Sequence, residues 1–94
     1  MNESHYQTRD LNLSAFLLVQ HGIAFKGLQT FDHKTKEFLF TPRSKCEKLA
    51  AEFISGEAEM SVRRFCDGLR LAKDLLFKTE RAEITLRPQQ GSFR

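Results

Sequence analysis

The chain has 94 residues, of which 40% are hydrophobic and 29% are charged, and its formal net charge is +3. A chain of this length forms one domain with a single core, because it buries only about 60 to 70% of the surface that its unfolded form exposes. The longest apolar run, residues 15–19, is far shorter than the roughly 20 residues that span a bilayer, so we expect no membrane partner. The first ten residues lack the features of a secretory signal, and we therefore expect a cytoplasmic protein.

The sequence carries few signs of catalytic chemistry. Its two cysteines, Cys46 and Cys66, show no Cys-x-x-Cys spacing and no histidine at metal-ligand spacing, so we expect no metal and no other cofactor. Both cysteines fall on apolar faces of predicted helices, where reduced cysteine packs as a small hydrophobe. A Gly-rich phosphate loop and a Gly-x-Ser-x-Gly elbow are also missing from the sequence. These features predict a protein without enzymatic activity.

The N-terminal part predicts an extended segment that runs into a buried helix. Residues 6–10 favour the extended segment, and Thr8 or Asp10 is suited to cap the helix that follows. This helix is apolar on all sides, which is typical of a central, buried helix. Gly22 predicts its end near His21, where a histidine would interact favourably with the helix dipole.

A β-hairpin follows the first helix. Its second strand, "KEFLFT", alternates cleanly and places Phe38 and Phe40 on one face. In the first strand the alternation slips at Gly27, which predicts a bulge or a sharp bend.

The second predicted helix begins at Thr41 and Pro42, and it ends at Gly56. Ser44 and Glu47 have the spacing of a capping box just inside its first turn. Its apolar residues recur at helical spacing: Cys46, Leu49, Ala50, Phe53 and Ile54.

The third predicted helix, residues 62–81, is capped by Ser61 and has one broad apolar stripe that we assign to the core. The stripe consists of Val62, Phe65, Cys66, Leu69, Ala72, Leu76 and Phe77. Basic and acidic residues share one edge of the same helix, as Arg63 with Asp67 and as Arg70 with Asp74, four residues apart. We interpret this edge as a solvated face rather than as a phosphate-binding face, because the carboxylates offset the cations.

These elements predict an α+β fold with three helices packed on one face of a small, mainly antiparallel sheet built on the hairpin. Residues 82–86 alternate like a further strand before Pro88 interrupts the pattern. We therefore expect a polar tail at residues 1–5, a single domain at residues 6–87 and a flexible tail at residues 88–94.

Basic residues gather at the hairpin turn and at the start of the second helix, and they form the candidate nucleic-acid surface. They are Lys34, Lys36, Arg43, Lys45 and Lys48. A projecting basic hairpin could contact the phosphate backbone of DNA or RNA without reading its sequence. The leading hypothesis is thus a small non-enzymatic module that contacts nucleic acid.

A narrow ridge on the third helix supports the alternative hypothesis, a protein-interaction module. The ridge consists of Gly68, Leu71, Ala72 and Leu75, outside the main apolar stripe. Its small residues would let another backbone come close. Either another element of the same chain covers this ridge, or a partner does; that partner would be a second copy in a homodimer or a host protein.

Several short motifs resemble a family of small domains of unknown function from bacteria, archaea and phages. The similarity covers residues 6–77. It rests on Tyr6-x-Thr8-x-Asp10-Leu11, on Gly22, on the strand with Phe38 and Phe40, and on Lys73-Asp74-Leu75-Leu76-Phe77. The resemblance implies a protein of phage or mobile-element type with a DNA-associated or host-interaction role, and it implies no active site.

Overall fold

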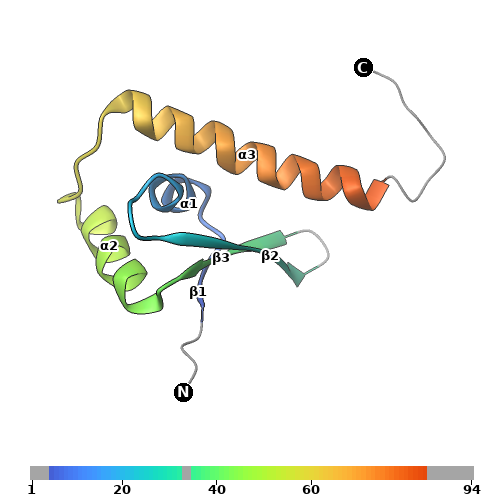
Figure 1. Ribbon diagram of the computed structural model, residues 1–94, viewed down its shortest axis with the longest axis horizontal. Coiled ribbons are helices and arrows are strands. Elements are labelled where there is room, and N and C mark those ends of the chain that lie inside the picture. The colour runs from blue at the N-terminus through green and yellow to red at the C-terminus, as the bar shows by residue number, and fades with distance from the viewer. Residues whose placement is uncertain (1–4, 33–34, 85–94) are drawn as a thin grey trace.

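The computed structural model describes residues 5–32 and 35–84. The helices and strands are β1 (Tyr6–Thr8), α1 (Leu11–Leu18), β2 (Ala24–Asp32), β3 (Thr35–Thr41), α2 (Arg43–Ser55) and α3 (Val62–Ile84). Three helices and one antiparallel sheet confirm the predicted α+β class (Figure 1). The tail predicted at residues 88–94 lies outside the described residues, as do the first four residues of the N-terminal tail.

The sheet has the strand order β1-β3-β2, so β3 is central. The N-terminal segment pairs antiparallel with β3, and Tyr6 lies opposite Phe40. β2 and β3 form the predicted hairpin, whose register shifts between Phe25 and Gly27. Gly27 has a φ of 128° there, a conformation that side-chain-bearing residues rarely adopt. The predicted bulge at Gly27 is therefore confirmed.

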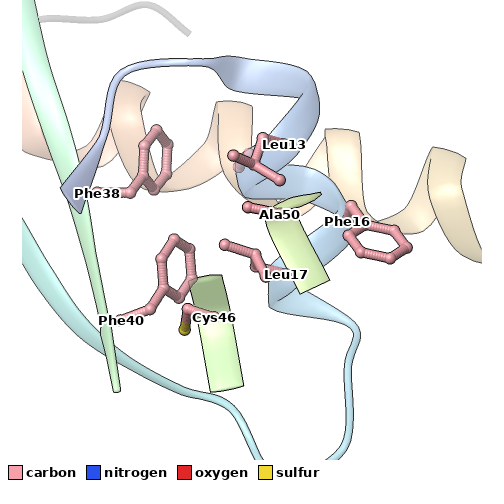
Figure 2. Close-up of a cluster of buried hydrophobic side chains, with 8 residues drawn as sticks. Leu13, Phe16, Leu17, Phe38, Phe40, Cys46 and Ala50 are labelled. Carbon is pink, nitrogen blue, oxygen red and sulfur yellow. The ribbon is translucent and has the colours of Figure 1, made fainter. Parts of the chain in front are cut away.

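The core lies between α1, the sheet and α2. Figure 2 shows how side chains from these three elements converge on one another. The buried apolar residues are Leu13, Phe16 and Leu17 of α1, Phe38 and Phe40 of β3, Cys46 and Ala50 of α2, and Ala72 of α3. α1 lies between the sheet and α3 (Figure 1), which explains why α1 is apolar on all sides.

The two residues predicted as candidates for the N-cap, Thr8 and Asp10, both stabilise the start of α1. The Asp10 carboxylate is the N-cap and accepts hydrogen bonds from the amides of Asn12 and Leu13, at 2.9 and 3.2 Å. The Asp10 amide in turn donates to the Thr8 hydroxyl at 3.1 Å. This arrangement satisfies amides of the first turn that have no partner within the helix.

Cations from two other helices hold the C-terminal end of α1. The helix ends at Leu18, earlier than the predicted end near His21. Beyond it, the Arg64 guanidinium donates to the Val19 carbonyl, and the Lys45 ammonium donates to the His21 carbonyl at 3.0 Å. The cation predicted for this end is thus supplied by Arg64, which binds the C-cap carbonyl, whereas the Lys45 contact and the exposed imidazole of His21 lie past the last turn.

The start of α2 differs from its prediction. Thr41 still belongs to β3, Pro42 occupies the N-cap, and no side chain caps the helix, so the predicted capping box is wrong. Glu47 instead accepts a hydrogen bond from Arg43 at 2.9 Å, one turn away. This ion pair takes the carboxylate that the capping box would have used. Gly56 ends α2 in the left-handed conformation, as expected.

α3 begins as predicted and continues further than predicted. The Arg64 amide donates to the Ser61 hydroxyl at 3.1 Å, which confirms Ser61 as the cap. The helix then runs to Ile84, so residues 82–84 are helical and the strand predicted over residues 82–86 is wrong there. Glycine and proline are absent between Leu69 and Ile84, and three alternating apolar residues are too few to stop a helix already formed.

Candidate functional site

α1 and α3 cross at small residues. Gly68 is buried, and a Cβ added to it would clash with the Ala15 carbonyl oxygen and lie 3.0 Å from the Ala15 carbonyl carbon. Ala15 and Ala72 are both 0% exposed. Such small side chains let the two backbones come close. Of the two alternatives for the ridge, the structure thus places an element of the same chain, α1, over Gly68 and Ala72.

The other two ridge residues have different surroundings. Leu75 is partly buried and packs against the core. Leu71 is 43% exposed and lies at the edge of that crossing, roughly 60° around the helix from Gly68. The ridge is therefore divided between the interior and the solvent, with Leu71 as its exposed member.

The apolar stripe that we assigned to the core is only partly buried. Val62 is 78% exposed, Phe77 is 57% exposed and Cys66 is exposed as well, so the prediction is wrong for these three residues. The buried face of α3 is centred near Ala72, roughly 70° around the helix from the middle of the stripe at about 100° per residue. The close approach of α1 at Gly68 causes this rotation, because only that side of α3 admits another backbone.

The rotation leaves an apolar face of α3 toward solvent, which we call the outer face. It consists of Val62, Cys66, Leu69, Lys73 and Phe77, which fall within roughly 80° of one another around the helix. Leu69 is half-buried, and the other members are exposed. This face was not predicted from the sequence, although Gly68 and Ala72, four residues apart, indicate that the helix contact lies on another side.

Cations lie beside the outer face. Arg63 and Arg70 lie along one edge of it, and Lys73 lies within it. Arg70 pairs with Asp67 at 3.5 Å, three residues away, instead of with Asp74 as predicted. Asp67 therefore forms its ion pair with Arg70 rather than with Arg63. The side chains of Arg70 and Asp67 are both more than half exposed. Exposed pairs of this kind contribute at most about 1 kcal/mol, so they exchange partners easily.

The structure separates the candidate nucleic-acid residues that it describes. Lys36 lies near the start of β3 and donates to the Thr30 hydroxyl at 3.3 Å. Arg43, Lys45 and Lys48 lie on α2, beyond the other end of β3, which at seven residues spans about 23 Å. Lys34 lies outside the described residues.

The cations of α2 are also partly engaged. Arg43 pairs with Glu47, and Lys45 binds the His21 carbonyl. Lys48 is exposed and forms no ion pair within the described ranges. The basic residues on α2 thus include two with structural roles and one that is available for a ligand.

An open, polar depression of about 500 Å³ lies where β1 meets α1. It is lined by Gln7, Thr8, Arg9, Asp10 and Glu37. Its acceptors already have partners, since Asp10 caps α1 and Glu37 accepts from Gln29 at 2.9 Å. The depression therefore follows from the local structure and presents no convergent set of free groups.

Within the part of the chain that the structure describes, no three acidic, cysteine or histidine side chains lie close enough to hold a metal ion. Both cysteines are free thiols; Cys46 is buried and Cys66 is exposed. None of the described helices combines the length and the apolar character needed to cross a membrane.

Comparisons with known proteins returned no match among family models, curated proteins or solved structures. The resemblance to a phage and prokaryotic domain family, with the mobile-element role it implies, therefore stays a prediction.

Proposed function

We propose that this protein is a non-enzymatic interaction module that binds another protein through the outer face of α3. The observation that carries this proposal is the exposure of Val62, Cys66 and Phe77 along one side of a single helix. Scattered exposed apolar residues are normal in soluble proteins, but a row at helical spacing is typical of a helix that packs on something.

The dimensions of the helices support the proposal. α1 has eight residues and is about 12 Å long, whereas α3 has 23 residues and is about 34 Å long. α1 can therefore cover only about a third of α3. Complete burial of a valine or phenylalanine side chain stabilises a complex by about 1.5 to 3 kcal/mol, so the outer face holds enough apolar area to anchor a partner.

This surface differs from the ridge of the sequence-based hypothesis. Gly68 and Ala72 are covered by α1, so the interface with a partner protein would involve the neighbouring side of α3. Leu71, on the opposite side of α3 from the outer face, provides a comparison position on the same element.

Site-specific crosslinking in cell extract tests the proposal. A photoreactive residue at position 62 should capture a defined protein, and the same residue at position 71 should not. Introducing Cys66→Asp into the position-62 variant should abolish the capture, since a charge would then lie in the middle of the interface. Capture only from position 71, or capture that survives Cys66→Asp, would contradict the proposal.

Nucleic-acid binding is a second candidate, favoured by cations on the surface. Lys48, Arg63 and Lys73 are exposed and form no ion pair within the described ranges, and the net charge is +3. Because counterion release drives such binding, labelled DNA and RNA should bind more weakly as salt rises from about 50 to 200 mM. The charge reversals Lys48→Glu and Arg63→Glu should weaken binding further. Absence of binding at the lower salt concentration would eliminate this candidate.

A further inference from the structure

We infer that the outer face of α3 binds an amphipathic helix whose apolar stripe is flanked by acidic residues. This inference rests on the proposed function, and it specifies the chemistry of the partner. It is carried by the combination of apolar side chains and cations that the structure presents on one side of α3.

The apolar part of the face runs the length that a short helix would cover. Val62 and Phe77 are 15 positions apart, which corresponds to about 22 Å along the helix axis. The members recur at intervals of three and four residues, the spacing at which two packed helices place side chains between one another. A partner helix of about four turns therefore matches the face.

The charged residues around the outer face favour a partner of negative charge. Lys73 lies within the apolar row, and Arg63 lies along one edge of it. Both are exposed, and neither forms an ion pair among the side chains that the structure describes. The acidic residues Asp67 and Asp74 lie further around the helix, beyond the cations. A partner with carboxylates beside its apolar stripe would meet these cations, and complementary charges favour both the rate and the specificity of association.

The same charges disfavour a second copy of this chain as the occupant. Pairing two outer faces would place Lys73 and the flanking arginines of each copy near those of the other. Like charges opposed across an interface cost free energy that the apolar contacts would have to offset. The methylene groups of Lys73, in contrast, can lie along an apolar partner while its ammonium reaches a carboxylate at the edge.

A display library of 16-residue helical peptides tests the inference. All peptides share one leucine stripe, and the positions beside the stripe vary among Glu, Gln and Lys. Selection against the immobilised full chain should enrich Glu at these positions. By fluorescence anisotropy, an all-Glu peptide should bind at least about tenfold tighter than its all-Lys counterpart.

Two pairs of variants locate the binding. The double variant Val62→Asp, Cys66→Asp should weaken the all-Glu peptide by at least about tenfold, whereas Leu71→Asp should have little effect. The double variant Arg63→Glu, Lys73→Glu should also weaken binding of the all-Glu peptide. Its control is the double variant Lys26→Glu, Lys48→Glu, which changes the net charge equally at exposed positions outside α3. Val62 lies in the first turn of α3, where an added carboxylate interacts favourably with the helix dipole. Circular dichroism checks that each variant is folded.

The possible outcomes distinguish the inference from the proposed function. If the selection enriches peptides with Gln or Lys at the flanking positions, and their binding still depends on Val62 and Cys66, the inference is overturned and the proposed function stays in place. Sedimentation showing a dimer of the chain alone that Val62→Asp dissociates would have the same meaning, with a second copy as the occupant. If the double variant at Val62 and Cys66 weakens no selected peptide, both are overturned.

Discussion

Ser14 and Ser61 carry hydroxyl groups in opposite situations. Ser14 is 0% exposed, and its hydroxyl has no hydrogen-bond partner within the described part of the chain. The Ser61 hydroxyl accepts from the Arg64 amide and caps α3. A buried polar group without a partner lowers stability, whereas a helix cap raises it.

We predict that Ser14→Ala raises the free energy of unfolding by about 1 kcal/mol, because it removes an unsatisfied hydroxyl and improves helix propensity. Ser61→Ala should lower the same quantity by about 1 kcal/mol through loss of the cap. Urea denaturation of both variants checks the pair. A loss of stability in Ser14→Ala equal to that in Ser61→Ala would show that Ser14 has a partner in solution.

Tyr6 links stability to alkaline pH. Burial, followed by electrostatic interactions with Cys46, Glu47 and Asp10, raises the pKa of Tyr6 above its ordinary value of 10.0. The folded state then holds the phenolic proton more tightly than the unfolded state does. This contribution to stability is complete below about pH 10 and is lost as the pH rises through the raised pKa.

We therefore predict that the free energy of unfolding of the wild type falls above about pH 10, and that Tyr6→Phe, which cannot ionise, shows a shallower fall. Urea denaturation at a series of pH values from 8 to about 11 measures both slopes. Identical slopes in the two proteins would contradict the assignment of this effect to Tyr6.

At the scale of elements, the crossing of α1 and α3 depends on the absence of a side chain at Gly68. In an exposed helix, Gly→Ala stabilises by about 0.5 to 1 kcal/mol because glycine has a poor helix propensity. Here the added methyl group would meet the backbone of Ala15, which cannot move without displacing α1 from the core.

We predict that Gly68→Ala lowers the free energy of unfolding by about 1 to 3 kcal/mol, as expected for overpacking. Lys73→Ala, an exposed substitution on the same helix, should change it by less than about 0.5 kcal/mol. Thermal and urea denaturation compare the two variants. A Gly68→Ala protein as stable as the wild type would contradict the close crossing.

The elements themselves could be predicted from local signals. Asp10, Ser61 and Gly56 mark helix ends by chemistry that acts within one turn, and the alternation around Phe38 marks a strand in the same way. The predicted ion pairs and the capping box were less successful. Glu47 has two partners within reach, and sequence spacing does not determine which one it contacts.

At the scale of the whole molecule, the position of the outer face could not be predicted from helical periodicity. The apolar residues of α3 cover a wide arc, and periodicity gives the arc but not the part of it that contacts α1. That choice is made by backbone distance, through Gly68 and Ala72. Val62, Cys66 and Phe77 of α3 are consequently exposed, although the helical periodicity predicts that they belong to the core.

The same limit applies to the basic residues. Lys36 and Arg43 are close in the sequence but lie at opposite ends of β3, since an extended strand separates its ends by about 3.3 Å per residue. Only a structure shows which cations end up beside an apolar surface. Arg63 and Lys73 do, and the proposed partner chemistry follows from that placement.

The reactivity of the two thiols tests the orientation of α3 most directly. Cys66 lies on the outer face and is exposed, whereas Cys46 is 0% exposed within the core. With Ellman's reagent, the native protein should show one rapidly reacting thiol, and the second should react only on unfolding; Cys66→Ser should abolish the rapid phase. A native protein whose thiols both react slowly would place Cys66 in the interior and contradict the outer face.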